Sequence, residues 1–184
     1  MITLSQAKTV IEHLRPHLMP HVKEIEFCGS YRRKKRFVND IDIVMIERED
    51  YEFGSPTLSQ TIQKLDPAGI QESKAIGKSG VSRFLDGPAI KRFKFEGIMI
   101  DIYMATPQNY SCLKLIRTGS ANHNIKLTTL AKQQGLKLFA GGEGLCRTTL
   151  NNGKELIVET VQTQEDEILK HLLGTVPTPE QREV

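Results

Sequence analysis

Residues 40–46 place the tightest constraint on how this chain folds. Ile41 and Ile43 alternate with Asp40 and Asp42. Successive side chains of a β-strand point to opposite faces, so the isoleucines fall on one face and the two acids on the other. The sequence therefore predicts a strand anchored in a core, with two carboxylates side by side on the sheet.

A third acid repeats this pattern. Asp101 lies between Ile100 and Ile102, so it too points away from the apolar face of a predicted strand. Three carboxylates converge if the two strands are neighbours. Carboxylates held close together raise each other's pKa unless a cation neutralises them, and Mg²⁺ or Mn²⁺ suits oxygen ligands. The simpler alternative is a solvated strand edge.

A glycine-serine turn and a basic run precede the two acids. Backbone N–H groups and the hydroxyl of Gly29-Ser30 can bind a phosphate, and an arginine can neutralise it. By itself the run fits a solvated loop or a localisation signal. Its position between the turn and the acids instead favours nucleotidyl transfer, in which two metal ions hold the attacking and leaving oxygens. The run is Arg32, Arg33, Lys34, Lys35 and Arg36.

Composition narrows the class of protein. The chain has 184 residues, of which 39% are hydrophobic and 26% charged, enough for a core of one domain or two small lobes. No apolar run approaches the roughly 20 residues of a membrane span, and the N-terminus has no apolar signal core. We therefore expect an intracellular protein outside the membrane. Lysines and arginines number 25 against 22 acids, a net charge of +3.

Residues 1–105 are predicted to form a mixed α/β unit. The pattern predicts a helix over 5–18, begun by Ser5, and a second over 58–65. It predicts strands over 23–28, 40–46, 89–95 and 98–104, the last two joined by a hairpin turn at Glu96-Gly97. Residues 69–87 are expected to hold a strand and a flexible connection.

The second half is predicted to be mostly helical. One helix ends near Arg117, and Ser120 begins another, with Ile125 among its apolar positions. Short strands are expected over 136–139 and 145–148, followed by a turn at Asn152-Gly153. Thr163 is expected to cap a last helix that ends near 173, beyond which the tail frays.

Two motifs carry a resemblance to a known family. Gly29-Ser30-Tyr31-Arg32-Arg33 followed by Asp40-Ile41-Asp42 resembles an element of the polymerase β-like nucleotidyltransferase superfamily. The run Arg117-Thr118-Gly119-Ser120-Ala121-Asn122-His123-Asn124 is similar to the nucleotide-binding helix of family X DNA polymerases. Asp101 lies between the two, in the family's order. The resemblance covers nearly the whole chain.

The resemblance implies an α+β fold. A palm, with a mixed sheet and helices, would span 1–105, and a small α/β C-terminal lobe that selects the nucleotide would span 106–184. The implied function is a small DNA polymerase that adds dNMP to a primer 3′-hydroxyl, filling gaps in DNA repair. The cofactor would be two Mg²⁺ ions, with Mn²⁺ able to substitute.

The resemblance also implies roles for the residues at matching positions. Asp40, Asp42 and Asp101 would be the catalytic, metal-binding residues. The implied nucleotide-binding set is Gly29, Ser30, Arg33, Thr118, Gly119 and Asn124. The partners would be primed or gapped DNA and a dNTP, with the chain a monomer. The expected DNA contacts are Arg32, Lys34, Lys35, Arg36, Lys91, Arg92, Lys94 and His123.

Two departures from the family pattern matter. Ile116 and Arg117 stand where relatives often carry an aromatic pair that helps to exclude ribonucleotides. No lyase domain precedes the predicted palm, so we expect no deoxyribose-phosphate lyase activity. Two alternatives stay open: template-independent nucleotidyl transfer to nucleic-acid ends or another acceptor, and a non-catalytic module that binds DNA ends.

Overall fold

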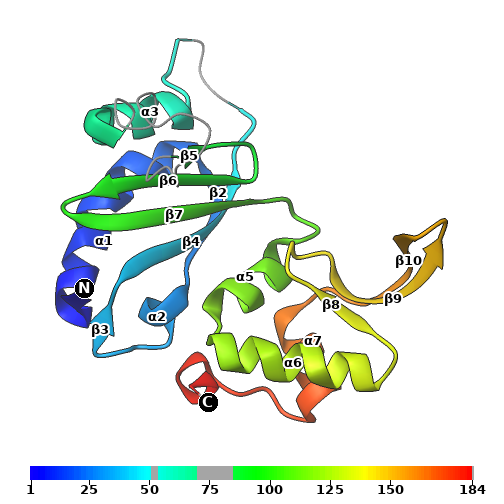
Figure 1. Cartoon of the computed structure of the whole chain (residues 1–184). Coiled ribbons are helices and arrows are strands. Elements are labelled where there is room, and N and C mark those ends of the chain that lie inside the picture. Colours follow the sequence, from blue (N-terminus) through cyan, green and yellow to red (C-terminus); the bar gives the residue numbers. More distant parts are fainter. Residues whose placement is uncertain (51–53, 70–84, 184) are drawn as a thin grey trace. The chain divides into compact units, whose positions relative to one another are not determined.

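The computed structural model describes residues 1–50, 54–69 and 85–183. The chain divides into two compact units, Met1–Met104 (unit 1) and Ala105–Val184 (unit 2). Both contain helices and strands, so the α+β class predicted from the sequence is confirmed (Figure 1).

A five-stranded sheet organises unit 1, in the order β2-β4-β7-β6-β5. Strand β2 pairs antiparallel with β4, β5 with β6, and β6 with β7. The predicted hairpin turn lies between β6 and β7, where Glu96 and Gly97 both have positive φ. The strands are β2 (Val22–Phe27), β4 (Asp40–Glu47), β5 (Leu85–Asp86), β6 (Ile90–Phe95) and β7 (Ile98–Ala105).

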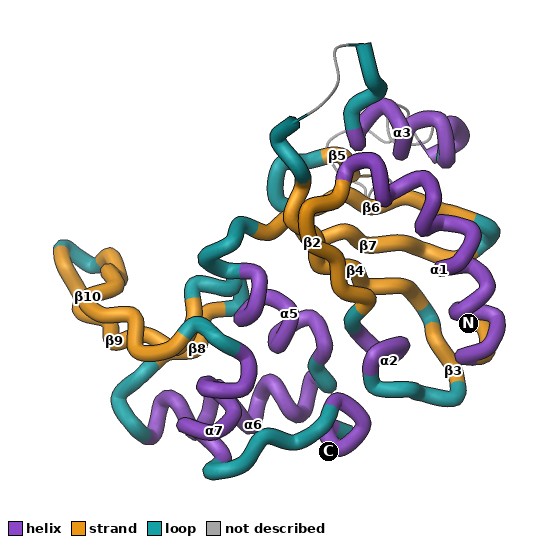
Figure 2. The backbone as a smooth tube through the Cα atoms, turned by 180° about the vertical axis from the view of Figure 1, so that it is seen from behind, coloured by secondary structure: helices purple, strands orange, loops and turns teal. Residues whose placement is uncertain are grey.

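Helix α1 (Leu4–Leu18) packs against one face of this sheet (Figure 2). Its apolar stripe, which includes Ala7 and Leu14, is buried together with Ile41, Ile43 and other strand residues. The predicted start at Ser5 was wrong by two residues. Thr3 caps the helix instead, because its side chain and that of Gln6 form a reciprocal capping box.

The remaining elements of unit 1 are short. Helix α3 (Leu58–Leu65) has the predicted bounds and is capped by Thr57. The Gly-Ser turn is a one-turn helix, α2 (Gly29–Arg32). The other pieces are β1 (Ile2–Thr3), β3 (Phe37–Val38) and the 3₁₀ turn η1 (Met19–His21). Most of the strand and connection predicted over 69–87 lies outside the described residues.

Unit 2 builds its core from three helices and a three-stranded antiparallel sheet, β10-β9-β8. The hairpin β9–β10 extends away from the helices of its own unit (Figure 1). Strand β10 was not predicted, although the Asn152-Gly153 turn was. The elements are α5 (Tyr110–Thr118), α6 (Ala121–Gln133), β8 (Lys137–Phe139), β9 (Gly144–Asn151), β10 (Lys154–Gln162), α7 (Glu165–Leu173) and η2 (Pro179–Arg182).

Three local predictions for unit 2 were wrong. Ile125 is 62% exposed, because it lies off the buried stripe formed by Leu127 and Ala131. Helix α7 has Gln164 as its N-cap, with no side-chain cap hydrogen bond from Thr163. The tail does not fray after Pro177, because η2 follows and Arg182 is buried.

Among the described residues, no helix combines the length and apolar character that crossing a bilayer requires.

Candidate functional site

Gly29 and Asp42 lie in direct contact where β2 ends. The Cys28 amide donates to the Asp42 carbonyl at 2.7 Å, which brings the two segments together. A Cβ at Gly29 would lie 2.1 Å from Asp42 Oδ2, and Gly29 has a φ of +58°. Any side chain here would therefore push the Asp42 carboxylate away and strain the backbone.

The three predicted acids lie on neighbouring strands and on one face. Asp40 and Asp42 are on β4, and Asp101 is on β7, its neighbour in the sheet. Ile41 and Ile100 belong to the core on the α1 side, so the acids between the isoleucines point to the opposite face. The strands that carry the three acids are thus neighbours, which was the condition that the sequence left open.

Asp101 is held by Arg92 from β6. The Arg92 Nε and Nη2 groups each donate to one carboxylate oxygen of Asp101 at 2.6 Å. The Asp101 side chain is only 4% exposed, whereas that of Arg92 is 31% exposed. The hydrogen bond with Asp101, helped by the charges of Asp101 and Asp40, raises the pKa of Arg92 above its usual range.

Sequence reasoning missed this pair, although a signal for it exists. A two-residue hairpin turn at Glu96-Gly97 sets Phe95 opposite Ile98. Counting back along both strands puts Arg92 opposite Asp101, as observed. Arg92 was instead expected to contact DNA.

The residues expected to bind phosphate follow Gly29 along the chain. Ser30 Oγ is buried and makes no hydrogen bond within the described part of the chain. A buried hydroxyl in that state can donate to a phosphate oxygen without first breaking a bond. Arg33 follows at the end of α2, half-buried, and Arg32 lies 4.0 Å from Glu26.

The basic residues differ in accessibility. Lys34, Lys35, Arg36 and Lys94 are exposed. Lys91 is 8% exposed, and its ammonium donates to Asp86 at 2.6 Å and to Ser59 at 3.0 Å. This buried, bonded ammonium is not presented to solvent, so the expectation that Lys91 contacts DNA is withdrawn.

In unit 2 the Thr118-Gly119-Ser120 motif joins α5 to α6. The Thr118 hydroxyl donates to the Lys114 carbonyl, and Gly119 has a φ of 64°. Ser120 caps α6 as predicted, since its Oγ accepts from the His123 amide. Asn124 donates to the Ile116 carbonyl at 2.8 Å.

Two residues of α6 that follow this turn, Asn124 and His123, differ in what they can offer a ligand. Asn124 Oδ1 is buried and makes no hydrogen bond among the described residues. His123 is 3% exposed, because its ring lies in the interior of unit 2. That burial argues against the expected contact between His123 and DNA.

A buried ion pair ties this turn to the C-terminus, a feature that sequence reasoning missed. Arg182 Nη1 donates to Glu165 Oε1 at 2.6 Å, and the two side chains are 2% and 6% exposed. The Arg182 carbonyl accepts from Ser120 Oγ at 2.9 Å. Glu165 and Arg182 lie in separate elements, so neither helix nor strand periodicity in the sequence predicts that they pair.

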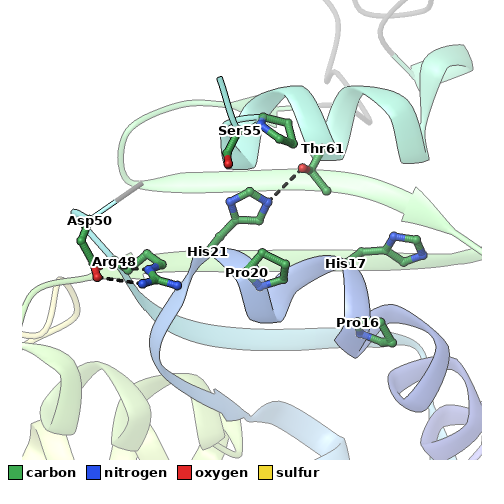
Figure 3. Close-up of a pocket in the computed structure, with 9 residues that line it drawn as sticks. Pro16, His17, Pro20, His21, Arg48, Asp50, Ser55 and Thr61 are labelled. Carbon is green, nitrogen blue, oxygen red and sulfur yellow. Dashed lines mark hydrogen bonds and ion pairs between the residues drawn. The ribbon is translucent and has the colours of Figure 1, made fainter. Parts of the chain in front are cut away.

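Unit 1 also holds a pocket of about 420 Å³ (Figure 3). His17 and His21 line it together with Arg48 and Asp50, which form an ion pair at 2.7 Å. His21 Nε2 bonds Thr61 Oγ1 at 2.9 Å, and burial lowers the pKa of this histidine. The hydrogen bond between His21 and Thr61 therefore connects η1 to α3, and the His21 ring is neutral near pH 7.

The three acids are chemically suited to bind a divalent cation. Asp40, Asp42 and Asp101 offer only carboxylate oxygens, the ligands that Mg²⁺ and Mn²⁺ prefer. Across residues 1–50, 54–69 and 85–183, however, no three acidic, histidine or cysteine side chains are grouped closely enough to hold a metal ion as they stand.

Comparison with known families decides what the chain is. The model of the DNA polymerase beta palm matches residues 3–99, more than half of the chain. The chain belongs to this family. The family X polymerase-like character expected from the sequence is thereby confirmed.

Similar proteins agree with membership of the polymerase beta palm family. A curated relative, the DNA polymerase/3'-5' exonuclease PolX of Bacillus subtilis, is 26% identical over 159 residues. The match takes in 86% of this chain and 22% of that protein, so the chain spans less than a quarter of the relative's length.

Solved structures confirm the fold. One is Leishmania infantum polymerase beta in a ternary P/T complex, with a TM-score of 0.67 and 18% identity. The match covers 100% of this chain and 77% of the Leishmania chain. Its ternary gap complex matches with the same TM-score and 71% coverage of that chain. At this identity the likeness establishes the polymerase beta fold.

Proposed function

We propose that this palm-family protein is a DNA polymerase that adds dNMP to a primer 3′-hydroxyl and fills short gaps. The observation that carries the proposal is the set of three acids on neighbouring strands, on the face opposite the α1 core. Gly29 and Ser30 lie against the same segment and add a phosphate-binding turn. A DNA-binding module without catalysis would need none of the three acids.

The proposed chemistry is an in-line displacement. The primer 3′-oxygen forms a bond to the α-phosphorus of the dNTP, the bond from the α-phosphorus to the oxygen bridging the β-phosphate breaks, and pyrophosphate leaves. Two Mg²⁺ ions held by Asp40, Asp42 and Asp101 would stabilise the charge on the attacking and leaving oxygens. Asp101 would also help to activate the 3′-hydroxyl.

Other residues would position the nucleotide. Ser30 Oγ and Arg33 are proposed to bind its triphosphate, and Gly29 leaves the space for that approach. Thr118 and Gly119 are proposed to contact its sugar; the Thr118 hydroxyl is already bonded to Lys114, so this contact would use the backbone. Asn124 would present Oδ1 to the base.

A primed template with a one-nucleotide gap tests the proposal. Wild-type protein is expected to extend the primer with dNTPs and Mg²⁺, and Asp101→Asn is expected to lose at least about a hundredfold in rate. The matched control is Asp86→Asn, since Asp86 also pairs with a cation at 2.6 Å but lies outside the three acids. Equal losses in both variants would contradict the proposed role of Asp101.

The substrate range is tested in the same assay. Extension of single-stranded DNA at a rate equal to that of gapped DNA would favour template-independent transfer. A wild-type protein that binds gapped DNA but extends no substrate would favour the binding module. Parallel reactions with rNTPs measure sugar discrimination in a chain that carries Ile116 and Arg117.

A further inference from the structure

Arg92 donates two hydrogen bonds to one of the acids of the proposed metal site. Both oxygens of the Asp101 carboxylate accept a hydrogen bond from its guanidinium, each at 2.6 Å. A carboxylate bonded in this way has its two strongest acceptor directions filled by a planar cation. Asp101 itself is almost fully buried, so solvent does not supply the other partners.

Arg92 also lies on the face of the sheet that carries the other acids. Arg92 lies on β6 directly opposite Asp101, and β7 separates β6 from β4 in the sheet. Asp40 is near enough for its charge to act on the guanidinium. Arg92 therefore neutralises part of the negative charge that three acids bring to one face of the sheet.

We infer that Arg92 competes with a divalent cation for Asp101. Its guanidinium pairs with the Asp101 carboxylate until the cation displaces it, and this competition sets the metal affinity of the site. The inference rests on the proposed function only in taking Asp101 as a metal ligand. A cation binding at Asp101 must share or replace a bond to Arg92, and the two positive charges repel.

Arg92 is in this sense a positioning residue, and metal affinity is the quantity it should change. The side chain of Arg92 is 31% exposed, so it has solvent into which it can turn when Asp101 takes a new partner. Asp101 lies on the central part of a strand and has no such freedom. The movement on metal binding is thus assigned to the arginine.

The test is a Mn²⁺ titration of the whole protein without DNA or dNTP, with free Mn²⁺ followed by electron paramagnetic resonance. Arg92→Gln is expected to bind Mn²⁺ at least about fivefold more tightly than wild type, because the competing cation is gone. Lys94→Gln is the matched control. It removes one exposed positive charge from the same strand, on which Arg92 and not Lys94 lies opposite Asp101.

A double-mutant cycle shows whether Arg92 acts through Asp101. In the Asp101→Asn background, adding Arg92→Gln is expected to leave the Mn²⁺ affinity unchanged within about twofold. An unchanged affinity in Arg92→Gln alone would overturn the inference. So would an equal gain in Lys94→Gln, or an equal gain in the Asp101→Asn background, since either would indicate a diffuse charge effect.

Thermal unfolding gives a second readout. Without metal, Arg92→Gln is expected to unfold at a lower temperature than wild type, because Asp101 loses its counter-charge. With saturating Mn²⁺ its rise in Tm is expected to exceed that of wild type, since tighter binding stabilises more. If Arg92→Gln does not fold, Arg92→Lys replaces it. That variant keeps the charge without the planar fork, so it should bind Mn²⁺ more tightly than wild type.

The two proposals fail separately. Primer extension by wild type decides the proposed function, and the Mn²⁺ affinities decide the role of Arg92. Tighter Mn²⁺ binding by Arg92→Gln with no extension by wild type would sustain the inference and reject the polymerase.

Discussion

At the scale of single residues, Gly29 meets two separate requirements. Its φ is +58°, and a Cβ would lie 2.1 Å from Asp42 Oδ2. Gly97 meets only the first of these, because its φ is +84° and no atom lies within 4 Å of an added Cβ. The two glycines therefore separate backbone strain from the displacement of a site carboxylate.

We predict that Gly97→Ala lowers the free energy of unfolding by about 1–2 kcal/mol, through backbone strain alone. Gly29→Ala should lose more, because Asp42 must also move. It should also weaken Mn²⁺ binding, which Gly97→Ala should leave intact. Urea unfolding and a Mn²⁺ titration measure both quantities. Equal effects of the two substitutions would contradict the role given to Gly29.

Two serines at turns differ in their hydrogen bonds. Ser30 Oγ makes none among the described residues. Ser120 Oγ accepts from the His123 amide at 3.3 Å and donates to the Arg182 carbonyl at 2.9 Å. Removing each hydroxyl should therefore have opposite consequences for stability and for ligand binding.

Ser30→Ala is expected to keep the free energy of unfolding within about 0.5 kcal/mol of wild type and to weaken dNTP binding roughly tenfold, the effect of one hydrogen bond to a charged oxygen. Ser120→Ala is expected to lose about 1 kcal/mol of stability as the cap of α6 is lost. Chemical unfolding and dNTP titration by fluorescence check both. Full dNTP affinity in Ser30→Ala would exclude Ser30 from phosphate binding.

At the scale of elements, the C-terminal segment stabilises the turn between α5 and α6. Arg182 anchors η2 through Glu165 on α7 and through the Pro177 carbonyl. Lys114 Nζ lies 3.6 Å from the other Glu165 oxygen. One buried carboxylate thus joins α5, α7 and η2 at the motif proposed to select the nucleotide.

Replacing Arg182 with Gln is predicted to lower the free energy of unfolding by about 3 kcal/mol, because Glu165 stays buried without its main partner. Lys114 compensates in part, which keeps the loss near the lower end of the usual range. The control is Arg147→Gln on β9, whose partner Glu159 and own side chain are more than half exposed. Exposed pairs of this kind contribute about 0–1 kcal/mol. Similar losses in the two variants, measured by urea unfolding, would show that the buried pair has no special role.

At the scale of the whole molecule, the modest net charge of +3 hides an uneven distribution. Lys34, Lys35 and Arg36 are consecutive and exposed, next to the turn proposed to bind phosphate. DNA affinity should therefore depend on salt mainly through this run, since each contacted phosphate releases counterions.

Substituting Lys34, Lys35 and Arg36 together with Ala is expected to make the slope of log affinity against log salt shallower by about 2–3, one step for each lost phosphate contact. The control replaces Lys126, Lys132 and Lys170, which are also exposed and lie on α6 and α7. Anisotropy of labelled gapped DNA over a range of salt concentrations gives the slopes. A control slope that changes as much would show that binding follows total charge, not this run.

Much of unit 1 could be predicted because its signals are local. Alternation of Asp40 and Asp42 with Ile41 and Ile43 predicted β4 and its faces, and a two-residue turn predicted the β6–β7 hairpin. Strand β10 escaped prediction because its seven N-terminal residues are all exposed and show no inside-outside alternation. The capping errors at Ser5 and Thr163 arose because neighbouring residues compete for the N-cap position.

The sequence by itself determined the family, the α+β class and the three acids, since these depend on residue type, spacing and order along the chain. Only the tertiary structure decided how those acids are held. Asp101 is bonded to Arg92, Asp42 lies against Gly29, and Arg182 is buried with Glu165. Such contacts depend on strand register and on distances between separate elements, which no single stretch of sequence specifies.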